Sequence, residues 1–140
     1  MRLLVKKLHP DAVLYPPRHA GDVGYDLAAR LDESLIIQPG ELRVIPTGIA
    51  VQIPEWHEGQ VRPRSSMMRE GLTAELGTID AGYRGEVKVV LHNRGTVKVV
   101  APDMRIAQLV ISPVVTPEIV EVEELGETSR GGGGFGSTGK

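Results

Sequence analysis

GTIDAGYRGEVKVVL, residues 77–91, joins a turn-forming segment directly to a strand-forming one. Glycine and aspartate favour turns because they tolerate backbone conformations that most residues avoid, and valine favours strands. We predict a tight, glycine-bounded hairpin over residues 77–85 and a strand over residues 85–91. Such a succession of turn and short strand is typical of an all-β protein.

The same pattern extends outward over most of the chain. Ten prolines and 17 glycines among 140 residues leave little room for long helices. Within residues 119–123, Val120 and Val122 alternate with Glu121 and Glu123, as a half-buried strand requires. The candidate strands cover residues 3–8, 34–37, 42–46, 49–52, 85–91, 96–100, 106–112 and 119–123. They predict a two-layer roll or sandwich.

We expect one short helical turn, over residues 65–70. Ser65 or Ser66 can cap its start, and Gly71 can end it. With 41% hydrophobic residues, the chain suits one compact domain with a single core.

Charge and composition exclude several classes of function. The net charge is -2, with 16 basic and 18 acidic residues well mixed, which argues against nonspecific binding to nucleic acid or membranes. The absence of cysteine excludes disulfides and thiolate metal clusters, and the four histidines are too scattered for a zinc motif. The N-terminal apolar run is too short for a signal peptide or membrane span, so we expect a cytoplasmic enzyme.

The C-terminal segment RGGGGFGSTGK, residues 130–140, has the composition of a ligand-binding arm. Glycines let backbone N–H groups approach phosphate oxygens closely, and Arg130 can bind a phosphate with two hydrogen bonds. Phe135 offers a flat face on which a base can stack. A disordered glycine tail is the alternative.

Four further segments combine unusual chemistry with ordinary alternatives. Asp26 is a carboxylate in an apolar stretch, which also suits a turn or a salt bridge. The sequence RPRSS, residues 62–66, suits an anion cradle at a helix start, or a plain N-cap with surface arginines. Asp80 and Tyr83 place an acid and a phenol in one turn, where Asp80 could orient a water molecule. Gln108 interrupts an apolar strand. Its amide either contacts a ligand or faces water at the edge of a sheet.

Taken together, these segments resemble the trimeric dUTP pyrophosphatase family, the dUTPases. Five motifs occur in the family's order: VGYDLAA at 23, PRSSMMREGL at 63, GTIDAGYRGEVKVVLHN at 77, RIAQLVI at 105 and RGGGGFGSTG at 130. The resemblance implies an all-β subunit with a β-clip or distorted jelly-roll fold and one short helix. It also implies a homotrimer with active sites at subunit interfaces. Residues 1–129 would form the domain, and the flexible arm of residues 130–140 would close over the site.

The resemblance also implies a reaction and a set of roles. Asp80 would be the general base for the water that attacks the α-phosphorus of dUTP, giving dUMP and pyrophosphate. Asp26 would help to hold Mg²⁺ through water and would support Arg64. The implied substrate contacts are Arg64, Ser65, Ser66 and Gln108 for the phosphates, Tyr83 for the deoxyribose, Gly77, Thr78, Ile79 and the nearby Lys88 for the uracil side, and Arg130, Phe135, Gly136, Ser137 and Thr138 from the arm.

Two departures from family patterns keep alternatives open. Ala74 stands where the family usually carries an asparagine that contacts the base, which leaves the strictness of uracil selection open. dCTP deaminases share this fold, but they rely on a glutamate where this chain has Val90. A noncatalytic nucleotide-binding β-clip trimer is the third alternative. It is disfavoured because a carboxylate such as Asp80 repels phosphate and is useful only for activating water.

Overall fold

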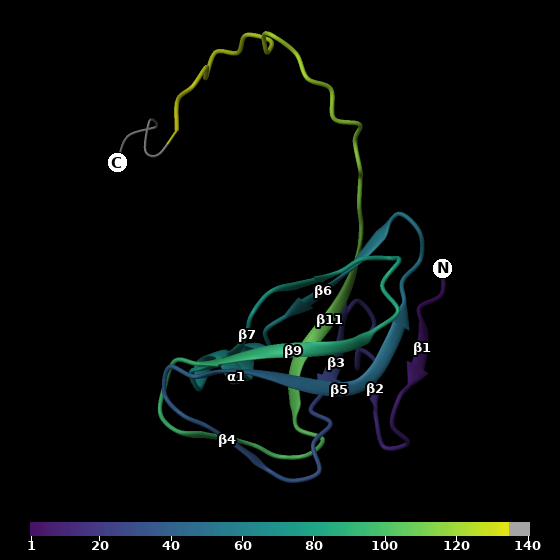
Figure 1. The fold of residues 1–140 in the computed structure, drawn as a ribbon, viewed down its shortest axis with the longest axis vertical. Coiled ribbons are helices and arrows are strands. Elements are labelled where there is room, and N and C mark those ends of the chain that lie inside the picture. The colour runs from purple at the N-terminus through teal and green to yellow at the C-terminus, as the bar shows by residue number, and fades with distance from the viewer. Residues whose placement is uncertain (135–140) are drawn as a thin grey trace.

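The structure is a computed structural model and describes residues 1–134. The regular secondary structure of the described chain is β-strand, apart from one short helix (Figure 1). The helix is α1 (Ser65–Arg69). The strands are β1 (Leu4–Lys7), β2 (Leu14–Tyr15), β3 (Gly24–Ala28), β4 (Leu35–Ile37), β5 (Leu42–Gln52), β6 (His57–Arg62), β7 (Leu72–Ala74), β8 (Gly77–Ile79), β9 (Glu86–Asn93), β10 (Lys98–Val100) and β11 (Arg105–Pro113).

The strands form two main antiparallel sheets and a small third one. The four-stranded sheet has the order β1-β5-β9-β7, and the five-stranded sheet has the order β2-β3-β11-β6-β8. The remaining pair is β10-β4. The predicted all-β fold with one short helix is confirmed.

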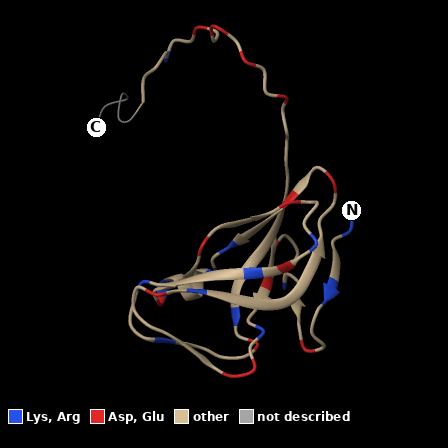
Figure 2. Ribbon diagram, viewed as in Figure 1, with Lys and Arg blue, Asp and Glu red and all other residues tan. Residues whose placement is uncertain are grey.

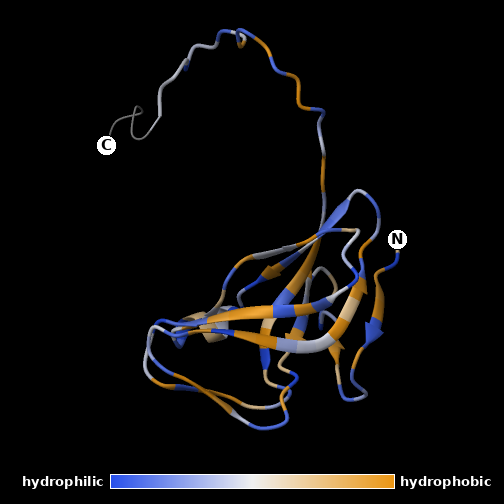
Figure 3. Ribbon diagram, viewed as in Figure 1, coloured by the Kyte–Doolittle hydropathy of each residue, from blue (hydrophilic) through white to orange (hydrophobic). Residues whose placement is uncertain are grey.

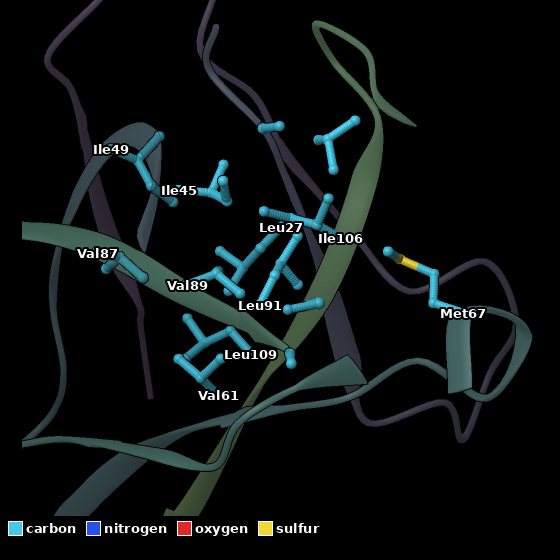
Figure 4. Packing of buried hydrophobic residues seen from close by; sticks show 14 of the residues in the cluster. Leu27, Ile45, Ile49, Val61, Met67, Val87, Val89, Leu91, Ile106 and Leu109 are labelled. Carbon is cyan, nitrogen blue, oxygen red and sulfur yellow. The ribbon is translucent and has the colours of Figure 1, made fainter. Parts of the chain in front are cut away.

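The core lies between the two main sheets. On β9, Val87, Val89 and Leu91 are buried, while the residues between them are more exposed, so this strand turns every second side chain inward. Leu27 and Leu109, from β3 and β11 of the other sheet, belong to the same cluster (Figure 4). β9 is largely hydrophobic, with hydrophilic residues at intervals along it (Figure 3).

Residues 77–85 do not form the predicted hairpin. β8 pairs with β6 in the five-stranded sheet, whereas β9 pairs with β5 and β7 in the four-stranded sheet. The connection between β8 and β9 therefore crosses from one sheet to the other. A turn is present in it, because the Tyr83 backbone N–H donates to the Asp80 carbonyl at 3.0 Å.

Three other local predictions need correction. Arg64, not Ser65 or Ser66, is the N-cap of α1, and it makes no side-chain capping bond, although Gly71 follows the helix with a positive φ as predicted. Residues 42–46 and 49–52 belong to one strand, β5, with an irregularity between Pro46 and Ala50. Residues 119–123 form no strand and are exposed, since no described strand pairs with them.

After β11 the chain leaves the two sheets and extends away from them (Figure 1). Residues 115–132 are all exposed, and several glutamates lie along this stretch (Figure 2). Within residues 1–134, no helix has the length and apolar character needed to cross a membrane.

Candidate active site

Asp26 on β3 lies between two arginines. The Arg64 Nε donates to Oδ1 of Asp26 at 3.0 Å, and the Arg105 Nη1 donates to Oδ2 at 3.2 Å. Arg64 Nη1 also donates to the Arg105 carbonyl at 2.9 Å. All three side chains are between 23% and 29% exposed, so the cluster is partly shielded but open to a ligand. Two positive charges against one carboxylate leave a net positive charge for an anion.

Strand register brings these residues together. Asp26 pairs with Gln108 on β11, and Gln108 pairs in turn with Arg62 on β6. Arg64 follows β6 two residues later, and Arg105 begins β11. Three segments that are far apart in the sequence therefore meet in one row of the five-stranded sheet.

Gln108 lies on the central strand of its sheet, so the interpretation as an edge residue is wrong. Its Nε2 donates to the Pro63 carbonyl at 3.0 Å, and its Oε1 lies over Gly24. A Cβ on Gly24 would come within 2.1 Å of that oxygen, so a side chain there would displace the amide. Gln108 and Asp26 also line a polar cleft of about 450 Å³, together with residues 16–24 except Ala20.

The two serines of the predicted anion cradle lie beside this cluster. Ser65 and Ser66 are the first residues of α1 and are both exposed. Neither hydroxyl makes a hydrogen bond to another side chain within residues 1–134. Both hydroxyls are thus available to a ligand bound next to Arg64.

Sequence reasoning missed Arg105 and the two residues that support it, Tyr15 and Asp103. The Arg105 guanidinium lies 4.0 Å above the centre of the Tyr15 ring, a cation–π arrangement. The Tyr15 hydroxyl donates to Oδ2 of Asp103 at 2.7 Å, and this hydrogen bond raises the pKa of Tyr15, so the phenol stays protonated as a donor. The sequence offers one signal for Arg105, its place three residues before Gln108 in RIAQLVI.

Asp80 and Tyr83 lie in the connection between β8 and β9, which we call the acid turn (residues 80–85). Asp80 is exposed, and Tyr83 is 46% exposed. Arg84 Nη1 donates to the carbonyls of Ala81 and Tyr83, at 2.6 and 2.9 Å, and so braces the turn. The Tyr83 hydroxyl donates to the Glu86 carbonyl at 3.0 Å.

The residues predicted to contact the base flank the acid turn. Gly77, Thr78 and Ile79 form β8, an edge strand whose outer backbone groups are free of sheet pairing within the described chain. Lys88 is exposed on β9, with its Nζ 4.0 Å from Oε2 of Glu86. Ala74 is buried and belongs to the core cluster.

Within one chain, the acid turn lies far from the arginine cluster formed by Asp26, Arg64 and Arg105. Asp26 lies in the row of Gln108 on β11, whereas Asp80 follows β8 at the row of Ser112. Asp26 and Asp80 are therefore separated by four residues along the strand direction, and by three strand spacings across the sheet, from β3 to β8. At about 3.3 Å per residue and about 4.8 Å per strand, the separation is roughly 20 Å.

The predicted arm residues lie largely beyond the part of the chain that the structure describes. Arg130 is exposed, and its Nε donates to the Gly133 carbonyl at 2.8 Å. The other predicted contacts, Phe135, Gly136, Ser137 and Thr138, lie outside the described residues.

Asp26 is a suitable ligand for a magnesium ion held mainly by phosphates. Within residues 1–134 there is no group of three or more acidic or histidine side chains able to hold a metal by themselves. Mg²⁺ prefers oxygen ligands, keeps several waters, and is commonly bound by one or two carboxylates plus substrate phosphates. One carboxylate engaged by two arginines fits such an ion through water, and does not fit an all-protein metal site.

The fold and this cluster define an all-β, jelly-roll-like protein in which two arginines around one carboxylate suit an anionic ligand. Comparison with known proteins is consistent with this. The family model described as dUTPase matches residues 11–139. The chain belongs to the dUTPase family, and the resemblance expected from its five motifs is confirmed.

Individual relatives agree over nearly the full length. The chain is 52% identical over 128 residues to the deoxyuridine 5'-triphosphate nucleotidohydrolase of an Anaeromyxobacter species, covering 89% of this chain and 87% of that one. It is 47% identical over 143 residues to the enzyme of the same name from Gloeothece citriformis, covering 99% and 97%. A Staphylococcus bacteriophage 80alpha dUTPase mutant with dUpNHpp matches it with a TM-score of 0.92 and 32% identity, covering 99% of each chain. A dUTPase mutant from phage phi11 of S. aureus, described as coordinating a structural Mg(II) ion, matches with a TM-score of 0.81 and 30% identity, covering 89% of this chain and 98% of that one.

Proposed function

We propose that this protein hydrolyses dUTP to dUMP and pyrophosphate by attack of water on the α-phosphorus. The observation that carries the proposal is the net positive cluster of Arg64, Asp26 and Arg105 beside a polar cleft in a chain of the dUTPase family. The curated relatives named above are dUTP nucleotidohydrolases, and the 80alpha phage enzyme binds dUpNHpp. Their common chemistry supports the same substrate here.

In the proposed mechanism Asp80 takes a proton from the attacking water as the new bond to the α-phosphorus forms, and pyrophosphate leaves. General base catalysis needs a carboxylate open to water, and the exposure of Asp80 supports this role. Arg64 and Gln108, with the two serines of α1, would bind the phosphates. When bound, Mg²⁺ would offset triphosphate charge, and Asp26 would hold it through water.

The remaining predicted contacts divide between sugar and base. Tyr83 would pack against the deoxyribose and exclude a 2′-hydroxyl, since an apolar pocket alone rejects an added hydroxyl by only about 100-fold. The backbone of β8 would read uracil, with Lys88 nearby, and Phe135 would stack on the base. Arg130, Gly136, Ser137 and Thr138 would complete the phosphate end.

We further propose a homotrimer whose sites combine two copies of the domain with an arm. The phosphates of one dUTP must reach the arginine cluster while its α-phosphorus meets Asp80, yet these groups lie roughly 20 Å apart in one chain. A second copy that presents its acid turn to the cluster would remove this separation. This supports sites at subunit interfaces.

The reaction is tested by incubating the protein and magnesium with dUTP, dCTP, dTTP and UTP, and measuring pyrophosphate and ammonia separately. We expect pyrophosphate from dUTP and no ammonia from dCTP. The result with dTTP and dCTP also measures base selection in a chain with Ala74. Ammonia from dCTP would indicate a deaminase instead, and neither product would indicate a binding protein.

Deleting residues 130–140 is expected to reduce kcat/KM for dUTP by about 5-fold to 150-fold, because stacking on one base contributes about 1–3 kcal/mol. The melting temperature should stay at its full-length value, since residues 115–132 are exposed and make no contact with the core. Steady-state kinetics and thermal denaturation measure the two effects. An unchanged kcat/KM would mean that the arm is only a tail, and Phe135→Leu tests stacking without deletion.

A further inference from the structure

Gly85 lies against the ring of Tyr83. A Cβ built on Gly85 would come within 2.3 Å of the Tyr83 Oη and 2.5 Å of its Cζ. Carbon atoms not bonded to each other pack at about 3.5–4.0 Å, so a side chain at position 85 and the ring cannot occupy these positions together. The ring therefore occupies space that only a glycine leaves open.

The hydroxyl of Tyr83 is anchored on the following strand. It donates to the carbonyl of Glu86, the first residue of β9, and this bond ties the phenol to the four-stranded sheet. The side chain is 46% exposed and does not belong to the hydrophobic core. Its hydrogen bond to Glu86 and the space at Gly85 both contribute to its position.

We propose that Gly85 is a positioning residue for selection of 2′-deoxynucleotides. It would act through Tyr83, by leaving open the space that the ring needs in order to block a 2′-hydroxyl. The inference rests on the proposed function, because Tyr83 is a barrier only if a nucleotide sugar packs against it. A methyl group at position 85 would push the ring outward by rotation of its two side-chain torsions. Because the ring is outside the core, the fold would be kept.

The test compares two alanine substitutions in the same turn. Gly85→Ala introduces the clash, whereas a Cβ on Gly82 would meet nothing within 4 Å, so Gly82→Ala is the matched control. We expect the ratio of kcat/KM for dUTP over UTP to fall by about tenfold or more in Gly85→Ala. The ratio should keep its wild-type value in Gly82→Ala. An unchanged ratio in Gly85→Ala, or an equal fall in both variants, would overturn the inference.

A double variant separates displacement of the ring from other effects of the substitution. In a Tyr83→Ala background there is no ring to displace, so adding Gly85→Ala should not lower the ratio further. A further fall there would overturn the inference. If Gly85→Ala alone fails to fold, Tyr83→Ala/Gly85→Ala should fold because the clash is gone, and failure of both would also overturn it.

The wild-type protein is measured first, which keeps the two hypotheses apart. Wild-type protein that releases no pyrophosphate from dUTP would overturn the proposed function itself. Wild-type protein that hydrolyses dUTP and rejects UTP, with a Gly85→Ala variant that rejects UTP equally well, would overturn only the role of Gly85.

Discussion

Asp80→Asn should lower kcat for dUTP by a factor on the order of 10² to 10⁴, the contribution typical of a positioned general base. Asparagine has nearly the shape of aspartate but cannot accept a proton from the attacking water. Binding should persist, because the substitution removes a negative charge near the triphosphate. Rapid-quench turnover measures the first effect, and the dissociation constant of dUpNHpp measures the second.

Asp11→Asn is the matched control for this prediction. Asp11 is also an exposed aspartate in a turn, and its Oδ2 lies 3.7 Å from Nδ1 of His9. It lies outside the proposed site, so kcat should be unchanged. Turnover by Asp80→Asn at the rate of the Asp11→Asn control would remove Asp80 from the mechanism.

The fold was predictable where the hydrophobic pattern is regular. β9 reads EVKVVLHN and buries every second residue. Turn-forming residues precede and follow it, and the strand predicted over residues 85–91 ends within two residues of the observed bounds. β6 reads HEGQVR, and only Gly59 and Val61 of this strand are buried. Its mostly polar composition does not predict a strand. This segment is a strand because it pairs with β11 and β8, and that pairing depends on residues far away in the sequence.

Strand partners were the least predictable feature. The segment over residues 77–85 looks like a hairpin because turn residues separate two apolar runs, yet the two strands pair in different sheets. Local sequence specifies that a chain turns, but not which strand it meets afterwards. Residues 119–123 show the same limit, since their alternation suits a strand but no described strand lies beside them.

Part of the candidate site was predictable from the sequence, and part was not. Asp26, Arg64 and Gln108 were predicted from their motifs, and the five-stranded sheet brings them together. Arg105 was missed because an arginine at the start of a strand has the appearance of ordinary surface charge. Its contacts with Asp26 and with the Tyr15 ring depend on tertiary structure alone.

Mixing two inactive variants is expected to restore hydrolysis if each site combines two copies of the chain. Arg64→Ala removes a phosphate ligand from the cluster, and Asp80→Asn removes the base from the acid turn. In a trimer refolded from both, an intact cluster of one subunit can meet an intact acid turn of another. Random mixing in equal amounts would give about one intact site in four. Activity is measured on each variant refolded alone and on the co-refolded mixture.

The control is a mixture in which both lesions lie in the acid turn, Asp80→Asn with Tyr83→Ala. Every site then receives a defective turn, so co-refolding should give no more activity than the two variants refolded separately. Rescue in the first mixture and not in the second requires that the cluster and the turn come from different chains. Equal activity in the two mixtures would place both groups within one chain, against the separation of roughly 20 Å that the strand register gives. Because a single dUTP cannot bridge that separation and still present its α-phosphorus to Asp80, this outcome would also remove Asp80, the arginine cluster, or both from the proposed site.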